Sequence, residues 1–371
     1  MNAGSQRVLG WDVLRGLCAL SVAVYHVLYW QDVAALHTLG SYGVYLFFVL
    51  SGASLAYNYQ GRLAGSGDAL RFLATRWLRL APLFLAACGL FLSLLAWRNG
   101  AWADRLPLRL ALNASFAFGG YDPVVWALPV GGWSLGIEFV YYLAFPLLLA
   151  LLPRRAWWLT AFVALALLQW FWIGRTAGSA DGYAASAVAY HQVPAFAAYF
   201  FGGCVIGAAR RARDLAWSAS AGAVVWLGTA ALLLALNPVA AGDELMGWRG
   251  AILFLACFAA VFASGQVQVG PRLAPVARWL GDITYGCYLL HPLFFWGFAW
   301  MVWPRLAQAE LSAASGLARA AVFAGVLVAT CATAWASERW FEAPVRRWGK
   351  RVLGRRRASG APHIEAASIS S

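Results

Sequence analysis

Residues 40–59 read GSYGVYLFFVLSGASLAYNY, a run of twenty residues without a single charged side chain. A helix rises about 1.5 Å per residue, so about 20 apolar residues cross the hydrocarbon core of a bilayer, which is about 30 Å thick. This stretch therefore predicts a transmembrane helix. Apolar stretches of similar length recur along the whole chain, and they decide the fold class.

Ten such stretches predict ten transmembrane helices. They lie near residues 9–30, 40–59, 78–97, 133–152, 157–174, 190–209, 217–236, 249–265, 283–303 and 316–338. The composition agrees, because 62% of the residues are hydrophobic and 12% are charged, whereas a soluble domain carries about 25% charged residues. The apolar stretch 106–118 is too short to cross and predicts an interfacial or re-entrant segment. The predicted fold is all-α, a polytopic integral membrane bundle of about ten transmembrane helices.

Basic residues predict which side of the membrane each connection faces. If ten helices cross, twenty of the 28 Lys and Arg residues lie on the side of the N-terminus, and Arg15 lies within the first helix. The other seven lie on the opposite side: Arg98, Arg105, Arg109, Arg175, Arg249, Arg305 and Arg319. Cytoplasmic connections carry such an excess. The sequence thus predicts a multi-pass plasma (bacterial inner) membrane protein with both termini in the cytoplasm.

The formal charge of +13 is spread over short clusters between apolar stretches. This pattern argues against a nucleic-acid partner and predicts contacts with anionic membrane lipids. Residues 1–348 are expected to form the transmembrane domain. Residues 349–371 are basic and then rich in Ser, Ala and Gly, which predicts a cytoplasmic tail that is disordered at its end.

Ionisable side chains within apolar stretches are costly and therefore indicate a functional site. Arg15 and His26 are eleven residues apart, which is about 16 Å along a helix and about three turns. They are expected to share one face of the first helix, with a fixed cation near the cytoplasm and a titratable imidazole near the outer side. The competing interpretation is an Arg that reaches to the interface and a His bonded to a backbone carbonyl.

Three further charged residues are candidates. Arg76 and Arg79 are neighbours on a helix surface at the inner mouth of the third stretch, where two guanidinium groups suit a phosphate-rich ligand; ordinary topogenic charges are the alternative. Glu138 lies near the outer entrance of the fourth stretch. It is expected to hold the His26 imidazolium or to orient an acceptor, unless it pairs structurally with an Arg. No two histidines have ligand spacing on one helix, so no metal site is predicted.

Several blocks together resemble the acyltransferase 3 family of membrane-bound O-acyltransferases, from about Trp11 to Pro344. The first block is an R-x10-H pattern formed by Arg15 and His26. The others are Gly43–Gly52, Arg76 with Arg79, Trp133-Ser134-Leu135 with Glu138, Leu280–Tyr285, His291-Pro292 and Glu342-Ala343-Pro344. Each block is weak alone, but the ordered set on a ten-helix frame is specific.

The resemblance implies a donor of the acetyl-CoA (acyl-CoA) type that enters from the cytosol, contacts Arg15, Arg76 and Arg79, and is used by an essential His26. The expected reaction is O-acetylation of an extracytoplasmic or membrane-associated carbohydrate or glycolipid, as in polysaccharide modification. His26 is expected to act as general base or to carry the acyl group; the sequence does not choose between these routes. It also leaves open the acceptor, the acyl chain length and the oligomeric state.

Two other functions compete with acyl transfer. A transporter or flippase of a polar glycan or lipid, without acyl-transfer activity, fits ten helices and intramembrane charges, but the sequence has no internal repeat of the kind that marks many transporters. A non-catalytic sensor or scaffold fits less well, because all five candidate site residues are present.

Overall fold

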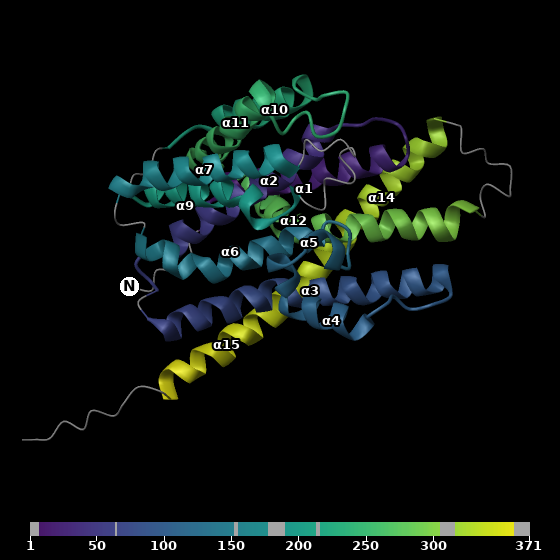
Figure 1. Cartoon of the computed structure of the whole chain (residues 1–371), viewed down its shortest axis with the longest axis horizontal. Coiled ribbons are helices and arrows are strands. Elements are labelled where there is room, and N and C mark those ends of the chain that lie inside the picture. Colours follow the sequence, from purple (N-terminus) through teal and green to yellow (C-terminus); the bar gives the residue numbers. More distant parts are fainter. Residues whose placement is uncertain are drawn as a thin grey trace, which may run out of the picture.

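The computed structural model describes residues 7–63, 65–151, 155–176, 190–212, 216–304 and 316–359, most of which are helical (Figure 1). Within these ranges there is no strand, and the one β-bridge joins Trp217 to Val267. The all-α class is confirmed.

The long helices account for all ten predicted stretches. They are α1 (Leu9–Trp30), α2 (His37–Tyr59), α3 (Ser66–Asn99), α6 (Gly132–Leu151), α7 (Ala156–Thr176), α9 (Ala197–Ala212), α10 (Ala219–Ala235), α11 (Gly247–Gln266), α12 (Ala274–Gly297) and α14 (Gly316–Ser337). By length and composition, seven helices of the described residues are able to cross a membrane: α1, α2, α3, α6, α7, α11 and the helix that begins with α14. The protein is thus a polytopic membrane bundle, and the number ten stays a prediction.

Helix α3 begins twelve residues earlier than the predicted stretch 78–97, at Ser66. Its first three turns carry Asp68, Arg71 and Arg76, so hydropathy does not identify them as part of a transmembrane stretch. They are nevertheless helical. As a result, Arg76 and Arg79 lie inside a continuous helix, and the expectation that they are helical neighbours is confirmed.

The short apolar stretch 106–118 forms α4 (Leu106–Ser115) and the start of η1 (Ala117–Gly120), and it is followed by α5 (Pro123–Trp126). It lies along α3 (Figure 1), where Trp77 Nε1 donates a hydrogen bond of 2.9 Å to the Ala114 carbonyl oxygen. Since Trp77 is in the first half of α3 and Leu106 follows its end, the segment turns back into the bundle rather than crossing it.

Glycines let the central helix α2 lie directly against α9. A Cβ atom on Gly203 would lie 2.1 Å from the Val49 carbonyl oxygen, and one on Gly207 would lie 2.1 Å from that of Ala53. From the other side, a Cβ on Gly52 would lie 2.1 Å from the Phe200 carbonyl oxygen. Small residues four apart on a helix allow such backbone contact within membranes, where apolar burial gives little driving force. The α2–α9 seam therefore fixes α2 in place.

A second close contact joins α1 to α12. A Cβ on Gly16 would lie 2.6 Å from Leu280 Cβ, so Gly16 is what allows the two helices to approach. Near the start of α1, Arg7 Nη2 is 2.9 Å from Asp282 Oδ1. Near its end, His26 meets His291. The two helices thus run in the same direction. We call the first end of the bundle the arginine end and the second the histidine end.

The last helices return to the arginine end. The π-helical turn η4 (Glu338–Glu342) joins α14 to α15 (Ala343–Ser359), and α12 continues into a similar turn, η3 (Phe298–Val302). Gly349 of α15 packs against Leu78 of α3. The helix passes through residue 349, so the predicted domain boundary is not an end of secondary structure. The predicted disordered end, residues 360–371, lies outside the described residues.

Candidate active site

Arg15 is held between α1 and α2. Its Nη1 donates to Asp12 Oδ1 at 3.3 Å, and its Nη2 donates to the Leu50 carbonyl oxygen at 3.3 Å and to the Ser54 hydroxyl. Its side chain remains 20% exposed. The guanidinium is therefore a fixed cation with one side open, as the sequence predicted for this position.

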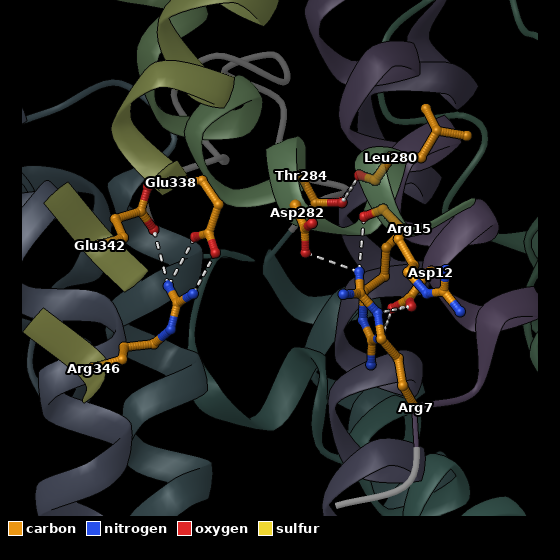
Figure 2. Close-up of polar contacts among 10 residues, drawn as sticks. Arg7, Asp12, Arg15, Leu280, Asp282, Thr284, Glu338, Glu342 and Arg346 are labelled. Carbon is orange, nitrogen blue, oxygen red and sulfur yellow. Dashed lines mark hydrogen bonds and ion pairs between the residues drawn. The ribbon is translucent and has the colours of Figure 1, made fainter. Parts of the chain in front are cut away.

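The carboxylates at the arginine end are already paired (Figure 2). Arg7 bonds to Asp12, to Asp282 and to the Arg278 carbonyl oxygen. On the other side of the view, Arg346 bonds to Glu338 through both of its terminal nitrogens and lies 3.8 Å from Glu342 Oε2. Within each cluster, opposite charges therefore lie in direct contact.

Arg76 and Arg79 make no direct ion pair of this kind among the described residues. Arg76 Nη2 donates to the Tyr59 hydroxyl at 3.0 Å, and its guanidinium lies over the rings of Tyr59 and Phe72. Arg79 is exposed; Arg15, Arg76 and Arg346 repel it, and Glu138 attracts it. Among the described residues, no carboxylate lies within ion-pair distance of Arg76 or Arg79. Neighbouring guanidinium groups without a carboxylate in direct contact favour the binding of an anion.

Glu138 lies on the side of the arginines. Its Oε1 accepts hydrogen bonds from Ser51 Oγ at 2.6 Å and from the Tyr142 hydroxyl at 2.5 Å, and it interacts electrostatically with Arg15 and Arg79. The sequence suggested that Glu138 holds the His26 imidazolium. In the structure, the side chain hydrogen-bonded to His26 is His291 instead.

His26 and His291 face each other at the histidine end. His26 Nδ1 is 3.0 Å from His291 Nε2, and His291 Nδ1 is 3.0 Å from the Cys287 carbonyl oxygen. His291 is 1% exposed, whereas His26 is half-buried and stacks on Trp30 with 4.7 Å between ring centroids. No group of three or more His, Cys, Asp or Glu side chains gathers in the described part of the chain, so the pair is best explained by a hydrogen bond.

In the sequence, His291-Pro292 is one block of the family resemblance, and no role is predicted for His291. Its local signal is a place inside an apolar stretch, directly before Pro292. Its partner lies 265 residues away, so no pattern within one helix predicts the pair.

Tyr288 connects the two ends of the site. Its hydroxyl is 2.7 Å from Ser134 Oγ and 2.8 Å from the Gly131 carbonyl oxygen. It interacts electrostatically with Glu138, and its ring centroid lies 6.3 Å from that of His291. Tyr288 thus lies between the arginine side of the site and the histidine pair. The arrangement combines a candidate anion site, hydrogen-bonding groups and a candidate base.

Comparison with known proteins fits this chemistry. The sequence matches the family model described as an acyltransferase domain over residues 8–339. It is also similar to acyltransferase MdmB of Streptomyces mycarofaciens, with 31% identity over 176 residues, which is 42% of this chain. The match spans 43% of that relative's length. No solved structure matches the chain.

Proposed function

The chain belongs to the acyltransferase 3 family, and from this premise we propose that it is a membrane-bound O-acyltransferase. It takes an acetyl or longer acyl group from acyl-CoA and transfers it to a hydroxyl of a carbohydrate or glycolipid. It works in the bacterial inner membrane, with both termini and the donor site on the cytoplasmic side and the acceptor reached from the other side.

The observation that supports this proposal is that Arg76 and Arg79, which make no direct ion pair among the described residues, lie beside the fixed cation Arg15. Acyl-CoA presents several phosphate groups at the end remote from its thioester. Guanidinium groups bind phosphate oxygens through paired hydrogen bonds. Three convergent arginines at one end of the bundle suit that end of the donor, and its extended pantetheine arm suits the polar groups beyond them.

The reaction then needs a base near the thioester. His26 takes the proton from the acceptor hydroxyl, and the oxygen forms a bond to the thioester carbonyl carbon. As the carbon–sulfur bond breaks, the electron pair leaves with sulfur, and the His26 imidazolium gives its proton to this sulfur. The products are an ester and free CoA. Such a base contributes about 10²- to 10⁴-fold to the rate.

The test follows label from acetyl-CoA in membranes that contain the protein and its envelope glycans. Wild type is expected to place the labelled acetyl group on a glycan through a base-labile ester, and the product should be heavier by the mass of one acetyl group. His26→Ala is expected to lower this rate by about 10²- to 10⁴-fold while the protein stays folded in the membrane.

His37→Ala is the matched control, because His37 is a second histidine near the same end, at the start of α2, and it contacts only Tyr25 and Tyr29 among the described rings. It should keep most of the activity. Near-normal turnover by folded His26→Ala contradicts the mechanism. Glycan movement across the membrane without any label transfer by wild type contradicts acyl transfer and favours a flippase.

A further inference from the structure

We propose that His291 is a positioning residue that holds His26 in the tautomer with its proton on Nδ1, which leaves Nε2 as the base. The kinetic consequence of this inference rests on the proposed function. The tautomer itself does not, because it is a property of the resting protein.

The argument begins with the Nδ1 atom of His291. A carbonyl oxygen only accepts hydrogen bonds, so the 3.0 Å contact with the Cys287 carbonyl requires a proton on His291 Nδ1. The helix leaves a further carbonyl without its usual partner beside this ring: Pro292 has no amide hydrogen to donate to the Tyr288 carbonyl four residues earlier.

The other ring nitrogen follows from the first. A neutral imidazole that donates through one nitrogen accepts through the other, so His291 Nε2 is an acceptor. His26 Nδ1 lies 3.0 Å from it and must donate. The proton of a neutral His26 therefore lies on Nδ1, so His26 Nε2 carries a lone pair.

The geometry also separates the roles of the two rings. His291 is buried at 1% exposure and bonded on both sides, whereas His26 is half-buried. Only His26 is open to a substrate. When His26 Nε2 takes a proton, the Nδ1–H bond to His291 Nε2 becomes charge-assisted and stabilises the imidazolium. A neutral imidazole thus does the orienting work that a carboxylate does in the Ser-His-Asp triad.

Two substitutions separate positioning from packing. His291→Gln restores an acceptor oxygen near the place of Nε2, whereas His291→Leu fills similar volume without an acceptor. We expect His291→Leu to lower kcat by about 10²- to 10⁴-fold, the range of a lost general base, with little change in KM for acyl-CoA. His291→Gln should recover at least a tenfold part of that loss.

The direct readout is ¹⁵N NMR of the purified protein in lipid nanodiscs with labelled histidine, with His26→Ala used to assign the His26 signals. We expect protonated Nδ1 and unprotonated Nε2 at His26 in wild type and in His291→Gln. A proton on Nε2 of His26 in wild type overturns the inference, as does a folded His291→Leu with normal kcat. If His291→Leu does not fold, the tautomer in wild type and in His291→Gln decides.

Failure of the proposed function has a different signature. A wild-type protein that transfers no acyl group but shows the expected tautomer contradicts acyl transfer and supports the His291 assignment. A wild-type protein that transfers acyl groups but shows the opposite tautomer supports acyl transfer and contradicts the His291 assignment.

Discussion

Arg15 and Arg79 lie close enough to repel each other, yet their surroundings differ. Arg15 is bonded to Asp12, Leu50 and Ser54, so its removal also leaves Asp12 with one partner fewer in a buried place. Arg79 is exposed and has no carboxylate partner among the described residues. Loss of Arg79 therefore tests anion binding with the smaller effect on folding.

Arg79→Gln is expected to raise KM for acyl-CoA by about 10- to 150-fold, which corresponds to a lost charge-assisted hydrogen bond of about 1.5–3 kcal/mol. Its thermal stability should not fall, because repulsion with Arg15 and Arg76 is relieved. The matched control is Arg98→Gln, which removes the same charge from the far end of the same helix, where Arg98 lies over Trp300. Steady-state kinetics with varied acyl-CoA measures both. An equal rise in KM for the two variants contradicts a donor site at Arg79.

Single residues also show how far the sequence predicts the site. The spacing of Arg15 and His26 needs only helix geometry, and both lie in α1 with Arg15 near its start. The partner of Glu138 could not be predicted in this way, because it depends on which helix packs beside α6. Ser51 of α2 supplies that contact, and His291 of α12 takes the place expected for Glu138. Contacts between helices that are far apart in the sequence depend on how the helices pack. The hydropathy of the sequence does not predict that packing.

The same limit applies to helices. Hydropathy predicted α1 to the residue, because both of its ends coincide with the ends of an apolar stretch. It missed the first twelve residues of α3, which are helical but polar. The glycines that decide the packing were visible in the sequence, yet Gly203 and Gly228 look alike there. In the structure, the first touches the backbone of α2 and the second has open space around it.

This difference predicts that a Gly→Ala substitution lowers the stability of the protein at Gly203 and raises it at Gly228. Gly203→Ala places a Cβ 2.1 Å from the Val49 carbonyl oxygen, so α2 and α9 must separate, at a cost of about 1–3 kcal/mol. Gly228→Ala meets nothing within 4 Å and should stabilise α10 by about 0.5–1 kcal/mol. Thermal unfolding in detergent, followed by size-exclusion chromatography, measures the order. Equal stability of the two variants contradicts the close α2–α9 seam.

At the scale of the whole molecule, the position of the two described chain ends restricts the number of crossings. Arg7 pairs with Asp282 at the arginine end, and Arg346 of α15 interacts electrostatically with the same Asp282. A chain that begins and ends on one side crosses an even number of times. If the seven candidate helices all cross, at least one further helix must cross, because seven is odd. We predict that helix α12, which follows α1 from Asp282 to His291, is the eighth crossing. Helices α9 and α10 then cross as a pair or not at all.

Contacts with helix α2, which is long enough to cross, show how far α9 and α10 extend along the bundle. At its end, Arg211 of α9 donates to the Tyr57 carbonyl oxygen, and at its start Thr38 bonds to Asn237, which directly follows α10. The pair therefore covers most of the length of a helix that crosses, although its members have 16 and 17 residues, near the lower limit of about 17 for a tilted span. We predict that both cross, which gives ten helices and places residues 216–218, directly before α10, on the side of the arginine end.

Single cysteines test this in intact cells with a membrane-impermeant maleimide, since the six native cysteines are buried or half-buried and wild type measures their background. Val239→Cys, after α10, is expected to react in intact cells, because Val239 is fully exposed and the predicted topology places it on the outer side. Ala216→Cys, before α10, should react only after permeabilisation, like the inner reference Arg62→Cys. With eight crossings, Ala216→Cys reacts as readily as Val239→Cys. If Arg62→Cys reacts in intact cells and Val239→Cys does not, the orientation is reversed, and the arginine end cannot receive a cytosolic donor.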